Sequence, residues 1–165
     1  MNITLRAPEL SDLDSLYYWE NDPEISRYGA ATAPYSRAQL WEYINNYDAD
    51  PFHAGQLRLM IDADDATIGC VDLYDIDAKN LRASIGIVID AAYRRNGYAK
   101  VAIEKLHEYC INSLGLHQLS VIIPLTNLPS LGLFVAVGYT TIATLPQWVR
   151  LGKNFVDANL LTHIL

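Results

Sequence analysis

Apolar residues along the chain repeat either every second position, as in strands, or every third to fourth position, as in helices. Helical spacing begins at Ser11, Ser36, Gly97 and Asn127, and a break falls at 21–23. The strand-like segments are 2–7, 56–62, 66–76, 82–90, 118–124, 139–149 and 154–164. The order β-αα-βββ-α-β-α-ββ predicts a mixed α/β fold in which helices flank a central sheet, as one domain over 1–165.

Several polar residues stand where helices and turns need them. Ser11 precedes Asp14 by three positions and Ser36 precedes Gln39 by three, which is the spacing of a capping box. Asn127 is a suitable N-cap for the short helix that follows it. We therefore expect helices to begin at these three positions.

The chain has 165 residues, of which 51% are apolar, with 12 Lys and Arg against 19 Asp and Glu. This acidic balance argues against nucleic acid as a partner, because phosphate binding needs clustered cations. The charge is divided unevenly. Residues 1–80 hold 15 acids and 5 bases, whereas residues 81–165 hold 4 acids and 7 bases.

Other classes of protein are disfavoured by what the sequence lacks. No apolar segment approaches the ~18 residues of a membrane span, and the first residues do not resemble a signal peptide. The two cysteines, Cys70 and Cys110, form no metal-binding spacing and no disulfide framework, and the four histidines are scattered. We expect a cytoplasmic protein with no metal site and no membrane partner.

The segment most informative about chemistry runs from Ser84 to Ala99, from a strand through a polar loop into a helix. The first N–H groups of such a helix point outward at the positive end of its dipole, which favours a phosphate. Gly97 allows close approach of a ligand, and cations stand nearby at Arg94, Arg95 and Lys100. The segment contains neither GxGxxG nor GxxxxGK[ST], so a dinucleotide or nucleoside triphosphate site is not supported.

Two motifs in this region give the chain a resemblance to the GNAT superfamily of N-acetyltransferases. Arg94 to Ala99 fits the family's pyrophosphate loop, Q/R-x-x-G-x-G/A, directly after the fourth strand. A second signature, N-x-x-S followed by an aromatic residue and G-[FY], is matched by the set Asn127, Ser130, Phe134, Gly138 and Tyr139. The resemblance covers essentially the whole chain and is strongest to the branch of ribosomal-protein and spermidine or diamine acetyltransferases.

The resemblance implies acetyl-CoA as co-substrate and a definite set of contacts for it. Backbone atoms of Ile87, Val88 and Ile89 would pair with the pantetheine arm. The remaining expected contacts are Arg94, Arg95, Asn96, Gly97, Tyr98, Ala99 and Lys100 for the phosphates, and Asn127, Ser130 and Phe134 for the pantetheine or acetyl end.

The sequence departs from its relatives at two catalytic positions. Ser84 stands where related enzymes often have Glu, and Phe134 stands where they often have a Tyr general acid. Ser84 has no carboxylate and Phe134 cannot donate a proton, so neither catalytic role is assigned to these residues. The remaining candidates for a base are Asp72 and Asp75 on the third strand. A buried thiol is favoured over a nucleophile for Cys110, so direct transfer in a ternary complex is the expected mechanism.

The acceptor side in such enzymes is built largely from the first two helices and their connection. Glu24, Tyr28 and Tyr35 occur there, and acids with aromatics suit a cationic amine. We expect a polyamine-like molecule or a protein N-terminal amine as acceptor, and a homodimer is compatible with the resemblance. Two alternatives stay open: an acyl-CoA-binding or regulatory domain without catalysis, and a structural partner module that binds no CoA.

Overall fold

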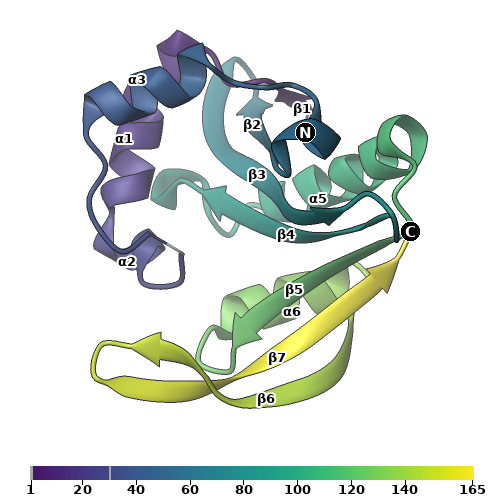
Figure 1. Cartoon of the computed structure of the whole chain (residues 1–165). Helices are drawn as coiled ribbons and strands as arrows, with labels where there is room; N and C mark the ends of the chain where they lie inside the picture. The colour runs from purple at the N-terminus through teal and green to yellow at the C-terminus, as the bar shows by residue number, and fades with distance from the viewer. Residues whose placement is uncertain (1, 30) are drawn as a thin grey trace.

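The computed structural model describes residues 2–29 and 31–165, which form a seven-stranded mixed sheet with helices on both faces (Figure 1). The sheet order is β1-β2-β3-β4-β5-β7-β6. The strands are β1 Ile3–Arg6, β2 Leu57–Ala63, β3 Ala66–Asp77, β4 Arg82–Ile89, β5 Gln118–Pro124, β6 Thr140–Leu151 and β7 Asn154–Ile164. The α-helices are α1 Leu13–Asn21, α2 Pro23–Ser26, α3 Arg37–Asn45, α4 Pro51–Ala54, α5 Tyr98–Tyr109 and α6 Leu128–Ala136.

The predicted fold class and order of the main elements are confirmed. Within the described ranges, no helix is long and apolar enough to cross a membrane. The capping box at Ser36 and Gln39 is present, and the Asn127 side chain accepts a hydrogen bond from the backbone N–H of Ser130. The helix expected over 97–114 ends in a turn of π-helix, Cys110–Leu114, before Gly115.

The predicted cap at Ser11 is wrong. A 3-10 turn, Leu10–Asp12, precedes α1, and the N–H of Glu9 donates to the Asp12 carboxylate at 2.8 Å. Burial raises the pKa of Asp12, but hydrogen bonds from the Arg6 guanidinium and the Glu9 backbone outweigh it, so this pKa lies below its ordinary value. Asp12 is the N-cap residue of α1, but its carboxylate bonds to Arg6 on β1 and to the Glu9 N–H and makes no cap hydrogen bond to α1.

Two apolar clusters lie on opposite faces of the sheet. The face covered by α1 and α3 buries the smaller cluster: Leu16, Trp19, Leu40, Ile44, Met60 and Cys70. The face covered by α5 and α6 buries the larger one, which includes alternate residues of β2, β3 and β4 such as Leu59, Val71 and Ile85. Successive side chains along these strands therefore point alternately into one cluster and into the other.

A cluster of aromatic rings joins the ends of α5, α6 and β7. His107 is buried, its Nε2 lies 3.2 Å from the Tyr139 hydroxyl, and its ring stacks on His163 at 4.7 Å between centroids. Burial, with His163 nearby, lowers the pKa of His107 to about 4. The folded protein therefore favours a neutral imidazole at this position.

We expect the free energy of unfolding to fall as the pH drops from about 6.5 to about 4, by about 2–3 kcal/mol. The unfolded chain gains a proton on His107 near pH 6.5, whereas the folded chain gains it only near pH 4, so acid favours unfolding in that window. Urea denaturation at about pH 7.5 and about pH 5 measures the difference. His107→Gln should flatten the slope, whereas His117→Gln, at an exposed histidine, should keep it. Equal wild-type stability at the two pH values would contradict the prediction.

Candidate active site

Contacts from β3 and from α1 hold the end of β4 and the loop that follows it. Gly69 on β3 packs so closely that an added β-carbon would lie 2.1 Å from the carbonyl oxygen of Val88. The Asp90 carboxylate accepts hydrogen bonds from Trp19 Nε1 and from the backbone N–H of Ala92, each at 2.9 Å. These contacts fix the loop that follows β4 relative to α1.

Helix α5 begins without a side-chain cap. Its N-cap is Gly97, at φ 82°, whereas Asp22, Ser36, Asp50 and Asn127 cap the starts of α2, α3, α4 and α6 with side-chain oxygens. The first N–H groups of α5 are therefore left for an external acceptor, as expected for an anion site.

The loop before α5 is exposed and carries two arginines. Residues 94–97 are exposed, and Arg95 lies in the left-handed region at φ 62°. Arg94 Nε donates to the carbonyl of Ile89 at 2.9 Å, which ties the loop to the end of β4. Lys100, in the first turn of α5, is exposed and lies 3.9 Å from Glu104. The predicted phosphate loop thus combines free amides with nearby positive charge.

Strands β4 and β5 pair over only three positions and then separate (Figure 1). The last pair is Ser84 with Ser120, whose hydroxyl oxygens lie 3.4 Å apart, although β4 continues to Ile89 and β5 to Pro124. Both strands still pair on their outer sides, with β3 and β7 respectively. The inner backbone edges of Ile87, Val88 and Ile89 consequently face an opening in the sheet, where an extended ligand could add as a strand.

Asn127, Ser130 and Phe134, which are expected to contact the pantetheine or acetyl end, lie in different surroundings at α6. The Asn127 side-chain oxygen caps the helix at 3.4 Å from the Ser130 nitrogen, and Ser130 is half-buried. Phe134 is only 1% exposed and packs edge-to-face against Tyr139 at 4.9 Å. Its ring therefore belongs to the core beneath α6.

Asp72, one of the two candidate bases, lies in a cluster of charges on the face of the sheet that α1 covers. Arg58 donates from Nε and Nη2 to the two Asp72 oxygens at 2.7 and 2.8 Å, and from Nη1 to Glu20 at 2.6 Å. Asp72 is also the cross-strand partner of Gly86 on β4. The carboxylate is thus beside the opened strand, with both oxygens already accepting hydrogen bonds.

Asp75, the other candidate, lies at an irregularity in β3. The register with β4 shifts between Tyr74 and Asp77, and Asp75 is exposed at φ 49°. Tyr74 extends over β4, because a β-carbon at Gly86 would lie 3.6 Å from its ring. Asp72 and Asp75 are therefore in separate environments rather than one shared site.

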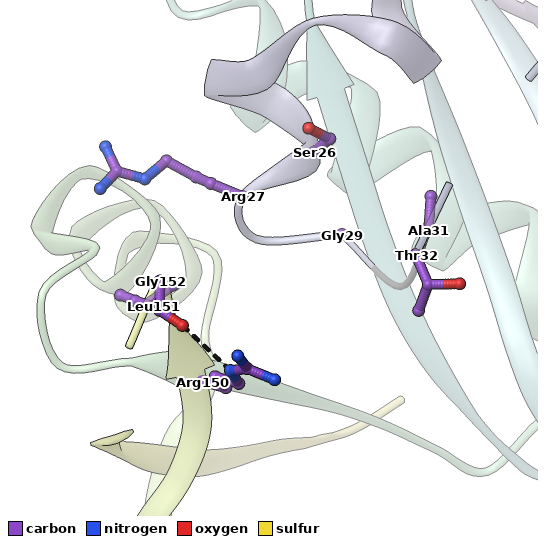
Figure 2. Close-up of a pocket in the computed structure, with 8 residues that line it drawn as sticks. All are labelled: Ser26, Arg27, Gly29, Ala31, Thr32, Arg150, Leu151 and Gly152. Atoms are coloured by element: carbon purple, nitrogen blue, oxygen red, sulfur yellow. Dashed lines mark hydrogen bonds between the residues drawn. The ribbon is translucent and has the colours of Figure 1, made fainter. Parts of the chain in front are cut away.

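Two hollows lie near α2. One, of about 560 Å³, is bounded by the end of α2, the start of the α2–α3 connection and the turn between β6 and β7 (Figure 2). The other, of about 490 Å³, lies against α1 and includes Tyr17, Tyr18 and Arg37. Glu24, Tyr28 and Tyr35, expected on the acceptor side, are exposed residues that line neither hollow.

No group of three or more His, Cys, Asp or Glu side chains is arranged to hold a metal ion in the parts of the chain that the structure describes. The groups that the candidate site offers are the α5 amides, the open edge of β4 and the charges around Asp72.

Comparison with known proteins identifies the family. Residues 2–140 match the family model of the acetyltransferase (GNAT) domain. The chain belongs to the GNAT acetyltransferase family. It is 27% identical over 158 residues to the uncharacterized N-acetyltransferase p20 of Bacillus licheniformis, covering 94% of this chain and 88% of that protein. It is 26% identical over 137 residues to the spermidine N(1)-acetyltransferase of Vibrio cholerae, covering 83% of this chain and 78% of that protein.

Solved structures agree with this GNAT assignment at the level of the fold. The crystal structure of spermidine N-acetyltransferase from Vibrio cholerae in complex with CoA and spermine superimposes with a TM-score of 0.87. It shares 23% identity and covers 98% of this chain and 95% of that one. As a GNAT N-acetyltransferase the protein uses acetyl-CoA as co-substrate. The uncapped start of α5, with Arg94 and Arg95 beside it, suits the negative charge of that molecule.

Proposed function

We propose that the protein transfers the acetyl group of acetyl-CoA directly to a primary amine bound in the same complex. The separation of β4 from β5 beside the uncapped start of α5 carries this proposal, because it supplies an open strand edge next to an anion site. The acceptor is a polyamine-like molecule or a protein N-terminal amine. A polyamine is supported by the similarity to spermidine N(1)-acetyltransferase.

In the proposed reaction, the amine nitrogen attacks the thioester carbonyl carbon. The C–N bond forms, the C–S bond breaks, the nitrogen loses a proton and the CoA thiolate leaves. An inward backbone N–H of β4, at Ile87 or Val88, stabilises the developing oxyanion. Arg94 to Lys100 hold the phosphates, and Asn127 and Ser130 contact the pantetheine end. Asp72 and Asp75 are the candidates for accepting the proton, directly or through water.

A decisive test combines acetyl-CoA with spermidine, a basic peptide with a free N-terminus and an aminoglycoside, and measures CoA release. Calorimetry with acetyl-CoA is performed beside it. Turnover with any of these amines supports the proposal. Binding of acetyl-CoA without turnover of any amine supports the alternative of a regulatory CoA-binding domain, which Ser84 and Phe134 favour because both lack the usual catalytic groups. Absence of binding would contradict both.

Direct transfer also predicts that neither cysteine is needed. Cys70 is 3% and Cys110 is 0% exposed, and burial raises the pKa of each thiol to about 12. A thiol with so high a pKa is a poor nucleophile at neutral pH. We expect Cys70→Ala and Cys110→Ala to retain kcat within about twofold while losing about 1 kcal/mol of stability from the small cavity. A covalent acetyl-protein adduct in mass spectrometry, lost in either variant, would contradict direct transfer.

A further inference from the structure

Tyr74 on β3 lies on the face of the sheet that carries α1 and α3. Cys70 packs into the apolar cluster beneath these helices, and side chains four residues apart in a strand point to the same face. The register between β3 and β4 is regular from Gly69 to Tyr74. The Tyr74 side chain is 41% exposed, whereas Phe134 is 1% exposed. Tyr74 is therefore an accessible aromatic residue on this face.

The hydroxyl end of the Tyr74 ring lies over Gly86 on β4. A β-carbon at Gly86 would lie 3.6 Å from Tyr74 Cε1, the ring carbon next to the one that carries the hydroxyl. The cross-strand partner of Tyr74 is Ser84, which is also the last residue of β4 that pairs with β5. The ring thus leans from the paired part of β4 toward the part that borders the opening.

The pairing of β4 with β3 decides which of its backbone groups face that opening. The N–H of Asp90 donates to the carbonyl of Ile68 at 2.8 Å, and the pairs that follow keep the same register. Bonded and unbonded pairs alternate in an antiparallel ladder, so Gly86 bonds to β3 and Ile87 does not. The N–H of Ile87, on the peptide bond that begins at Gly86, therefore points into the opening.

The direction of attack in the proposed reaction brings the amine to the same face as Tyr74. A pantetheine arm that adds to β4 as a strand has its carbonyl groups roughly in the plane of the sheet. A nucleophile attacks the thioester carbon from above or below that plane. On one side, Ile85 and Ile87 pack into the cluster beneath α5 and α6. The amine therefore arrives from the other side, over Gly86.

The other polar groups of this face already have partners. Asp72 accepts hydrogen bonds from Arg58 on both oxygens, and Glu20 accepts one from the same guanidinium. The hydroxyl of Ser84, which stands where related enzymes often have Glu, lies 3.4 Å from that of Ser120. These groups are less available than an unpaired hydroxyl to a further N–H.

The Tyr74 hydroxyl is such an unpaired group. Within the described residues, the hydroxyls of Tyr47 and Tyr139 form hydrogen bonds, whereas that of Tyr74 forms none. Burial, with Asp75 and Asp72 nearby, raises the pKa of Tyr74, so its phenol is protonated at neutral pH. A neutral oxygen accepts an N–H bond without favouring the charged form of an amine, as a carboxylate would, and only the neutral form attacks.

We propose that Tyr74 is an acceptor-binding residue whose hydroxyl accepts a hydrogen bond from the amine nitrogen and holds it beside the thioester at Ile87. This inference rests on the proposed acetylation of an amine. It adds to that reaction a residue that positions the acceptor and takes no part in proton transfer.

The test removes the hydroxyl and keeps the ring. The acceptor is whichever of spermidine, the basic peptide and the aminoglycoside is turned over fastest. We expect Tyr74→Phe to raise KM for this amine about tenfold and to keep kcat within about threefold. Tyr109→Phe is the matched control, because it removes a phenol hydroxyl at the other end of α5 from the loop of residues 94–97, and it should change neither constant. An unchanged KM in Tyr74→Phe would overturn the proposal.

Two further measurements exclude other roles for Tyr74. The affinity for acetyl-CoA, measured by calorimetry, should be the same in wild type and Tyr74→Phe, and a loss would place the hydroxyl against CoA instead of the acceptor. The profile of kcat/KM from about pH 6 to about pH 9 should keep its shape and fall by a constant factor. Loss of one limb of that profile would assign Tyr74 to proton transfer and would also overturn the proposal.

If no amine is turned over, the proposed acetylation fails by itself, and the contact with Tyr74 is tested by binding. Spermidine and the basic peptide are titrated into CoA-saturated protein. Affinity that is about tenfold weaker in Tyr74→Phe, and unchanged in Tyr109→Phe, supports the contact. Equal affinity in wild type and Tyr74→Phe, or no binding of either amine to the wild type, overturns it.

Discussion

Gly97→Ala should lower the affinity for acetyl-CoA by about tenfold to a hundredfold and leave the fold intact. Gly97 is the N-cap of α5 at φ 82°, where an L residue is strained by about 1–2 kcal/mol. The variant either keeps this conformation, with a β-carbon beside the exposed amides, or relaxes and turns those amides away from the phosphates. Both outcomes weaken the anion site, and calorimetry with acetyl-CoA measures the loss.

The other end of the same helical segment supplies the matched control. Gly115 follows the π-turn at φ 64°, and a β-carbon there would meet nothing within 4 Å. Gly115→Ala therefore carries a similar backbone strain without approaching the loop of residues 94–99. We expect both variants to lose about 1 kcal/mol of stability, but only Gly97→Ala to lose affinity for acetyl-CoA. Equal affinities in the two variants would place the phosphates elsewhere.

The fold and the exposed, glycine-capped loop before α5 could be predicted because their signals are local. The strand at 118–124 and the helix after Asn127 follow from the period of apolar residues and from one capping side chain. Gly97 and its arginines are adjacent in sequence, so a short motif describes them. The separation of β4 from β5 could be expected only from the resemblance, because it depends on pairing between segments about 35 residues apart in the chain.

The charged features of the site could not be predicted in this way. The site residues expected from the sequence do not include Arg58, which bonds to Asp72 and Glu20. A signal existed, because a lone arginine among the apolar residues of β2 needs a buried partner for its charge. Residues 1–80 hold 15 acids and 5 bases, but many of those acids pair with nearby arginines, so this imbalance does not by itself indicate an acidic acceptor site.

Arg58→Met should destabilise the protein by about 3–5 kcal/mol. The Arg58 side chain is 18% exposed and bonds to Glu20 at 25% and Asp72 at 26% exposure, so its removal leaves two partly buried carboxylates facing each other without a cation. The Arg58 guanidinium also lies 5.7 Å from the centre of the Tyr43 ring, a contact that methionine replaces in part. Urea denaturation near neutral pH measures the change. The loss of stability should be larger than that from breaking a more exposed ion pair of the chain.

A matched variant and a rescue distinguish charge from packing. Arg82 pairs with Asp77 at 3.1 Å but is 61% exposed, so Arg82→Met should cost less than about 1 kcal/mol. The triple variant Arg58→Met, Glu20→Gln, Asp72→Asn removes the uncompensated charges and should recover most of the lost stability. A triple variant as unstable as Arg58→Met would show that packing, rather than charge, is lost. Because the triple variant folds without the Asp72 carboxylate, its kcat also tests that residue as the base: a fall of about a hundredfold or more supports the role, whereas an unchanged kcat assigns Asp72 to the structural cluster alone.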